Sequence, residues 1–322
     1  MTYFFKNVYI NDKFSLLASS EKEPIVKKYT DKFVDSYYLE EKSIELAEGE
    51  YQNITITGLL NKNKLTQKDI SLLINSDLQN QILASSLSAS KYSVPMLGIY
   101  SACASFVEGL IIASNFISNK SQNIVVTVSG HNLVSEKQFR FPIEYGAVRK
   151  MVNSFTATGS VSTLVSNKKS NIKIESATIG NVIITDHKDA NDMGSCMAPA
   201  AAEVINRHLI ETNRESNYYD VILTGDLGVY GTEIMKKYYE NISNKKLKNV
   251  VDAGSIFYKE DTIYAGASGP ACLPLILFDY ILKQNKYKKI LVCATGALHS
   301  CVSCNLGEAM PGVAHVISLE VL

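Results

Sequence analysis

Residues 98–105 read Gly-Ile-Tyr-Ser-Ala-Cys-Ala-Ser. The first three residues have the pattern of the end of a strand, and the residues after them are small. An apolar helical pattern begins directly after Cys103, so this thiol is expected where a strand turns into a helix. The free N–H groups of a helix start favour a thiolate, and they also favour a bound carboxylate. Free cysteine is, however, among the most buried residue types. The residues alone leave both a packed, inert thiol and a reactive or ligand-binding thiol open.

The segments around this turn recur later in the chain, and each half has the order strand, strand, helix, strand. Continuous Val/Ile/Leu runs are typical of parallel strands covered on both faces, and helices that are apolar all round are typical of a buried layer. The sequence therefore predicts a duplicated α/β fold with a buried central layer. The elements are expected at 70–77, 95–100, 104–118 and 124–130, and again at 219–226, 263–270, 271–282 and 289–296.

The polar stretch Asn167–Asn171 is the expected seam between the two halves. We therefore predict an N-terminal half over residues 1–166 and a C-terminal half over 167–322. Before the first buried strand, residues 38–52 have the pattern of a polar amphipathic helix, and 61–68 that of a connecting loop.

Composition excludes several classes of protein. Hydrophobic residues make up 46% of the chain and charged residues 20%, as in an ordinary folded protein. Lys+Arg and Asp+Glu both total 32, so no overall field attracts nucleic acid, which is not an expected partner. The N-terminus has no signal-peptide pattern, and no stretch is apolar enough to span a bilayer. Six cysteines in such a chain indicate reduced thiols.

A second group of candidates follows the strand expected at 124–130. His131 stands just past the strand end, where open α/β sheets bind ligands. Lys137 and Arg140 are spaced to share one helix face, and both can pair with carboxylates. A structural histidine and a solvated charged segment explain the same spacing, so both interpretations stay open.

Cys301-Val302-Ser303-Cys304 is a single C-x-x-C motif. A structural zinc site needs a second such pair, and the motif does not lie in a thioredoxin-like sequence context. A metal-binding or redox role for it is therefore less favoured than a purely structural one. His299 and His315 are close to this motif in the sequence, but two histidines near one cysteine pair are weak evidence for a metal site. No glycine-rich nucleotide loop occurs, and we expect neither a metal nor a cofactor.

The Ser-Ala-Cys turn, the buried helix and the duplicated halves resemble the thiolase and ketoacyl-synthase superfamily, whose fold has five layers, αβαβα. Within it, the chain is similar to the stage V sporulation protein AD family over nearly its whole length. The stretches that carry this resemblance are 98–109, 129–132, 136–142, 144–146, 191–194, 197–201, 224–228, 294–298 and 311–315.

The resemblance implies a component of the SpoVA complex that binds dipicolinic acid, alone or as its calcium chelate. It also implies contact with membrane-embedded SpoVA subunits. Cys103 falls on the superfamily's nucleophile position. The histidine that the superfamily places before its second buried helix is missing, since residues 264–270 read Tyr-Ala-Gly-Ala-Ser-Gly-Pro. We therefore favour binding over catalysis, with Cys103, His131, Lys137, Arg140 and Ser268 as the expected ligand-binding residues.

The alternative is a Cys-dependent acyltransferase or condensing enzyme of the ketoacyl-synthase type, with Cys103 as nucleophile. The resemblance also implies a homodimer formed across a sheet edge. The expected location is the cytoplasm or forespore, with peripheral association to the spore inner membrane during sporulation and germination.

Overall fold

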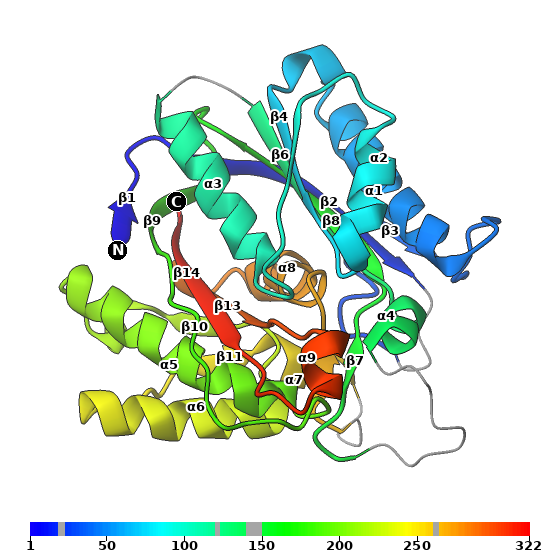
Figure 1. The fold of residues 1–322 in the computed structure, drawn as a ribbon. Coiled ribbons are helices and arrows are strands. Elements are labelled where there is room, and N and C mark those ends of the chain that lie inside the picture. The colour runs from blue at the N-terminus through cyan, green and yellow to red at the C-terminus, as the bar shows by residue number, and fades with distance from the viewer. Residues whose placement is uncertain (19–22, 120–122, 140–149, 260–263) are drawn as a thin grey trace.

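The main sheet is two wings joined at a narrow junction (Figure 1). β2 (Tyr9–Ala18) and β9 (Ile172–Thr178), one from each wing, pair at only two positions. The wings contain twelve strands in all among the residues that the computed structural model describes. These residues are 1–18, 23–119, 123–139, 150–259 and 264–322.

The two wings have the same strand order, which confirms the predicted duplication. The first wing runs β5-β4-β6-β8-β2 and the second β11-β10-β13-β14-β9, with parallel and antiparallel pairs at matching places. These strands span β4 Leu72–Ser76, β5 Met96–Gly98, β6 Asn123–Gly130, β8 Gly159–Ser166, β10 Val221–Thr224, β11 Val250–Asp252, β13 Lys289–Ala297 and β14 Gly312–Val321.

One predicted correspondence was wrong. The counterpart of β5 is β11, whereas residues 263–270 were expected to fill that place. Within that stretch, β12 (Gly266–Ser268) leaves the main sheet and pairs with β7 (Ser154–Thr156) from the other half. A three-residue strand such as β11 carries too little periodicity to be recognised in sequence.

Helices complete five layers, as the α/β thiolase-like prediction requires (Figure 1). α3 (Ser105–Asn119) and α8 (Cys272–Ile276) lie between the wings. The Phe106 and Phe278 rings pack edge to face there, with their centroids 6.0 Å apart. A π-helical segment, Leu277–Ile281, continues α8. The outer layers are formed by α1 (Ile44–Lys62) and α2 (Leu83–Ala89) on the first wing, and by α5 (Met193–Glu211) and α6 (Gly228–Ser243) on the second.

α1 differs from the helix expected at 38–52. It begins after Ser43, whose side chain accepts a hydrogen bond from the Leu46 N–H at 3.3 Å, and it runs to Lys62. Its buried face includes polar side chains such as Glu48 and Gln52, which weakens the amphipathic signal in the sequence.

The predicted seam is the connection between β8 and β9, which do not pair with each other but both pair with β2. β1 (Thr2–Phe4) also pairs with β9, so it joins the β2–β9 and β7–β12 pairs that connect residues on the two sides of the boundary at 166/167. β3 (Lys32–Val34) adds to β2 at the edge of the other wing. The division into two folding units stays a prediction.

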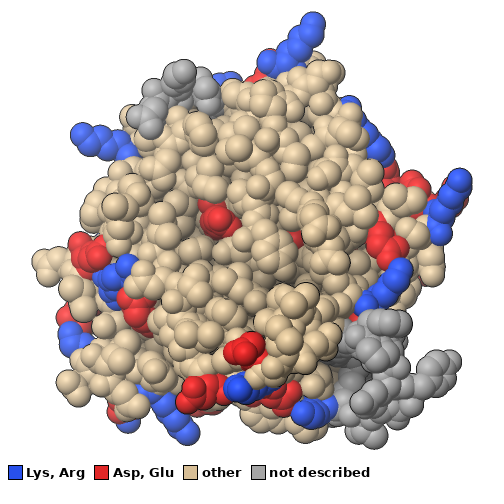
Figure 2. Space-filling model, in the orientation of Figure 1, with Lys and Arg blue, Asp and Glu red and all other residues tan. Residues whose placement is uncertain are grey.

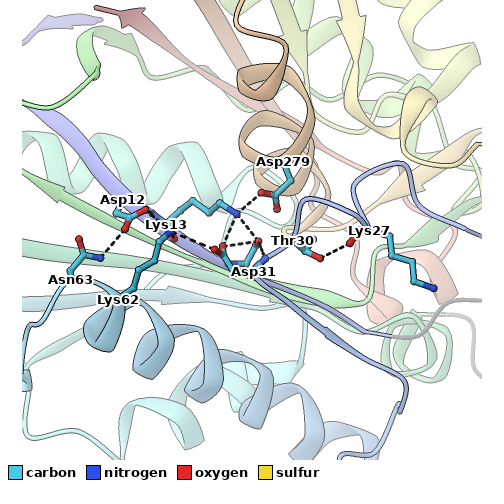
Figure 3. Close-up of polar contacts among 9 residues, drawn as sticks. Asp12, Lys13, Lys27, Thr30, Asp31, Lys62, Asn63 and Asp279 are labelled. Carbon is cyan, nitrogen blue, oxygen red and sulfur yellow. Dashed lines mark hydrogen bonds and ion pairs between the residues drawn. The ribbon is translucent and has the colours of Figure 1, made fainter.

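A buried ion pair links the two halves (Figure 3). Lys13 on β2 contacts Asp279 on the π-helical segment, and it also pairs with Asp31 at 2.7 Å. Asp279 is fully buried. Lys62 extends this network outward to Asp12, at 2.8 Å.

Among the described residues, no helix combines the length and apolar character that a membrane crossing requires. Figure 2 shows side chains of both charges scattered around one face, mostly near its edge, with a largely uncharged centre.

Candidate functional site

Cys103 lies in a strained turn between β5 and α3. Ala102 has a positive φ of 49°, which is uncommon for a residue with a side chain. The Ser105 hydroxyl fixes this turn, because it accepts a hydrogen bond from Ser101 N–H at 2.9 Å and donates one to the Ala102 carbonyl at 2.8 Å. Gly296 lets β13 approach, since a Cβ there would stand 2.3 Å from the Ser101 carbonyl oxygen. The turn thus holds the thiol at the interface of the two halves.

The thiol borders a narrow pocket, with a cavity volume of about 50 Å³, that both halves line. Cys103 and Ser268, both predicted as site residues, are in its wall. No lysine or arginine occurs among the lining residues that the structure describes, and Glu136 is the acidic one. The other lining residues are Leu78, Tyr100, Ala102, Ser135, Phe139, Ser154, Thr156, Ala190, Met193, Ala297 and His299.

Behind the pocket, the Cys103 thiol interacts with the buried carboxyl group of Asp226. That carboxyl accepts hydrogen bonds from the Gly269 N–H at 3.0 Å and the Thr295 hydroxyl at 2.9 Å. Burial raises the pKa of Asp226 to about 7, although these hydrogen bonds act to lower it. Burial also raises the pKa of Cys103 well above its usual value, and the charge of Asp226 raises it further. The sulfur is therefore a neutral thiol at physiological pH.

Ser268 lies in the stretch 264–270 before the second central helix, the stretch in which the superfamily resemblance predicts a histidine. Its side chain is buried, and its carbonyl accepts a hydrogen bond from the Ala157 N–H at 2.8 Å. The following Gly269 has φ +97°, a conformation that favours glycine, and this lets its N–H reach Asp226.

His131 does not line the pocket in this structure. It is buried beneath α1, where its Nε2 lies 3.0 Å from the Tyr37 carbonyl oxygen. Its ring stacks on the Tyr51 ring, with the two ring centroids 5.8 Å apart. Burial lowers its pKa. This environment fits the structural interpretation of His131 that the sequence left open.

Lys137 lies on α4 (Asn132–Phe139), outside the pocket, and pairs with Glu45 at 2.5 Å. Its side chain is 62% exposed, so this pair is a surface contact. Arg140, and the predicted matches within 140–142 and 144–146, lie outside the described residues. Of the five predicted binding residues, the structure thus brings Cys103 and Ser268 together.

Sequence reasoning missed two residues beside Cys103. The sequence marks Asp226 only as a repeat of Asp77 at the end of a strand, although such strand ends are where α/β proteins gather functional groups. It suggests His299 only as a partner of the C-x-x-C motif. His299 does contact that motif, because its Nε2 lies 3.3 Å from the Cys304 sulfur, but it also lines the pocket. No group of three or more metal-ligating side chains occurs in the described parts of the chain.

The fold and the position of the thiol define a thiolase-like protein. Cerulenin-bound OleA of Xanthomonas campestris has a TM-score of 0.63 to this chain, at 13% sequence identity over 98% of this chain and all of OleA. The tetronic acid condensing enzyme AbyA1 has a TM-score of 0.62, at 11% identity over 97% of this chain and 99% of AbyA1. At these identities the likeness concerns the fold.

Sequence comparison is more specific. The family model described as Stage V sporulation protein AD matches residues 1–320. The Stage V sporulation protein AD of Bacillus subtilis (strain 168) is 34% identical to this chain, over 99% of this chain and 96% of that protein. The chain belongs to the stage V sporulation protein AD family.

Proposed function

We propose that this protein binds dipicolinic acid, or its calcium chelate, as a component of the SpoVA complex. In this role it acts with membrane-embedded SpoVA subunits to move the acid across the spore membrane during sporulation and germination. Membership of the sporulation family and the chemistry around Cys103 support the proposal.

The observation that carries it is the burial of the Cys103 thiol beside the carboxyl group of Asp226. A nucleophilic cysteine needs a base or a lowered pKa, whereas the pKa of Cys103 is raised by burial and by Asp226. The stretch 264–270 has no histidine, and losing a single oxyanion donor costs about a hundred- to a thousand-fold in rate. Such a pocket is suited to holding a molecule without transforming it.

The lining suits a small, flat, aromatic acid. Tyr100 and Phe139 supply aromatic surface, and Ser135 and Thr156 can supply hydroxyl donors. The described lining carries one acidic group, Glu136, and no lysine or arginine. A neutral calcium chelate would avoid the cost of bringing a free dianion to such a surface. In this chelate the calcium ion is cargo that enters with the acid.

Isothermal titration with dipicolinate, with and without calcium, tests the proposal. We expect saturable binding that weakens at least tenfold in Tyr100→Ala. Tyr230→Ala is the matched control, since Tyr230 is a similarly exposed tyrosine on α6, outside the pocket. Absence of saturable binding under both conditions would contradict the assignment.

The proposed assembly uses two surfaces. β5 ends the path of the main sheet and exposes Leu97, so it offers an edge for a homodimer, which a strict monomer in light scattering at high concentration would refute. α6 offers a surface for peripheral association with the spore inner membrane. A slanted row of apolar side chains crosses its outer face at Tyr230, Ile234, Tyr238 and Ile242.

A Cys-dependent acyltransferase or condensing enzyme is the second candidate, favoured by one observation. His299, from the second half, lines the same pocket as Cys103. Incubation with acyl-CoA donors distinguishes the two functions. The binding proposal predicts no acyl adduct by intact mass, and an adduct that disappears in Cys103→Ala would favour the enzyme.

A further inference from the structure

Two cysteines lie one helical turn apart at the rim of the Cys103 pocket. Cys301 and Cys304 are the first and fourth residues of α9 (Cys301–Asn305), and both are partly exposed. Residues three apart in a helix have Cα atoms about 5 Å apart, by helix geometry. This separation falls within the range that a disulfide can bridge.

Both thiols make contacts that hold the pocket rim together. The Cys301 thiol donates a hydrogen bond to the Gln138 carbonyl on α4, at 2.8 Å. The Cys304 sulfur lies 3.3 Å from Nε2 of His299. The ring of Phe139, the residue after Gln138, packs edge to face on the His299 ring, with the ring centroids 5.0 Å apart. Both rings line the pocket. The reduced Cys301 thiol therefore connects α9 to α4 beside the pocket.

We propose that Cys301 and Cys304 form a thiol–disulfide exchange site whose oxidant is a low-molecular-weight disulfide. The Cys301 thiol gives its proton to solvent, and its sulfur attacks the small disulfide. A mixed disulfide forms on Cys301, and one small thiolate leaves. Cys304 then passes its proton to His299, which passes it on to solvent, and the Cys304 sulfur attacks Cys301 and releases the second small thiol. Two protein thiols are oxidised and one small disulfide is reduced to two thiols.

The roles of the two sulfurs follow from their surroundings. Burial raises the pKa of Cys304, so Cys304 is the thiol that needs a nearby base. His299 is in place to act as that base. In the disulfide, Cys301 has no hydrogen to donate to Gln138. Oxidation therefore removes one of the contacts between α9 and α4 and opens the pocket.

The first test is intact mass and peptide mapping of the folded, full-length chain after incubation with glutathione disulfide. We expect the loss of two hydrogen atoms, located at Cys301–Cys304 and reversed by reduced glutathione. Cys103→Ala should show the same loss. Cys304→Ser should stop at a glutathione adduct on Cys301, because the second attack is then impossible. No mass change in the folded protein, or a bridge to Cys196 instead, would overturn the proposal.

The second test measures the pocket. We expect iodoacetamide to alkylate Cys103 several-fold faster in the oxidised protein than in the reduced protein. The double variant Cys301→Ser, Cys304→Ser should show one rate under both conditions. If the disulfide forms and the rate at Cys103 does not change, the opening of the pocket is refuted. Neither readout involves dipicolinate, so these outcomes are independent of the proposed function.

Discussion

The Cys103 thiol and the Asp226 carboxyl group interact behind the pocket, one from each half of the fold. The pairing places a weak acid with a pKa of about 7 beside a thiol whose pKa is raised. Asp226 therefore suppresses the ionisation of the thiol, which is the opposite of what a nucleophilic cysteine requires. The hydrogen bond from the thiol acts in the other direction on Asp226, whose pKa is raised by burial.

This pairing predicts how the binding of dipicolinate depends on pH. Below pH 7 Asp226 is mostly protonated, and above pH 7 it carries a negative charge behind the pocket proposed to bind the acid. Because like charges repel, the affinity for free dipicolinate, measured without calcium, should fall by about fivefold between pH 6 and pH 8 for an interaction of about one pKa unit. Asp226→Asn should flatten the dependence in calorimetric titrations. An unchanged pH profile in this variant would show that another group is responsible.

The Lys13–Asp279 contact gives a prediction about stability (Figure 3). Lys13→Ala leaves the buried Asp279 without its charge partner, so we expect the free energy of unfolding to fall by about 3 kcal/mol or more. Lys245→Ala is the matched control, since Lys245 pairs with Glu215 at 2.8 Å on the surface, where water screens such pairs and they contribute little to stability. Denaturant unfolding measures both. Equal losses would mean that the buried pair does not stabilise the contact between the halves.

Glu48 on α1 predicts a second pH effect. Burial, together with the nearby charge of Asp77, raises the pKa of Glu48 to about 8. The unfolded chain releases this proton near pH 4.5, whereas the folded chain retains it up to about pH 8. Stability from this group is therefore complete at low pH and is lost as pH rises through 8, by on the order of 3 to 5 kcal/mol.

Glu48→Gln mimics the protonated form and should reduce this loss. The measurement is the free energy of unfolding at about pH 5 and about pH 8.5 for both proteins, on either side of most of this titration. Glu233→Gln, at a side chain that is 62% exposed, serves as the control. If wild type and Glu48→Gln lose the same free energy over this range, Glu48 is not the group that titrates.

Much of the fold could be predicted because its strongest signals are local. The runs at 124–130 and 289–296 are uninterrupted enough to identify central strands, and the helix expected at 104–118 is α3 within one residue at each end. β11 escaped recognition because three residues carry no period. Its place was given instead to a stretch that forms β12.

The site was less predictable from sequence because it depends on the direction of each side chain as well as on the position of each residue in the fold. Cys103 and Ser268 each precede a central helix, so their meeting follows from the duplicated pattern. His131 also follows a strand end, but its side chain turns toward Tyr51 on α1, and no sequence signal gives that direction. Asp226 was visible as a residue, but only the structure shows it against the thiol.

The outer face of α6 gives a prediction that tests the proposed association with a membrane. Tyr230, Ile234, Tyr238 and Ile242 are each more than a third exposed and follow one another at four-residue steps along the helix. Residues 228–248 contain five lysines and two glutamates, a net charge of 5 − 2 = +3. Apolar side chains flanked by lysines suit the interface of an anionic bilayer, where apolar groups enter the headgroup region and lysines stay with the phosphates.

We therefore expect the full-length chain to sediment with vesicles that contain anionic phospholipid, and to do so less as salt rises, because charge attraction is screened. Ile234→Glu should reduce the bound fraction several-fold, since it places a charge within the apolar row. Ile210→Glu is the matched control: Ile210 is 69% exposed at the end of α5 and lies outside this row. Equal losses in both variants would mean that general surface charge governs binding. Equal binding to purely zwitterionic vesicles would show that the lysines do not contribute to membrane binding.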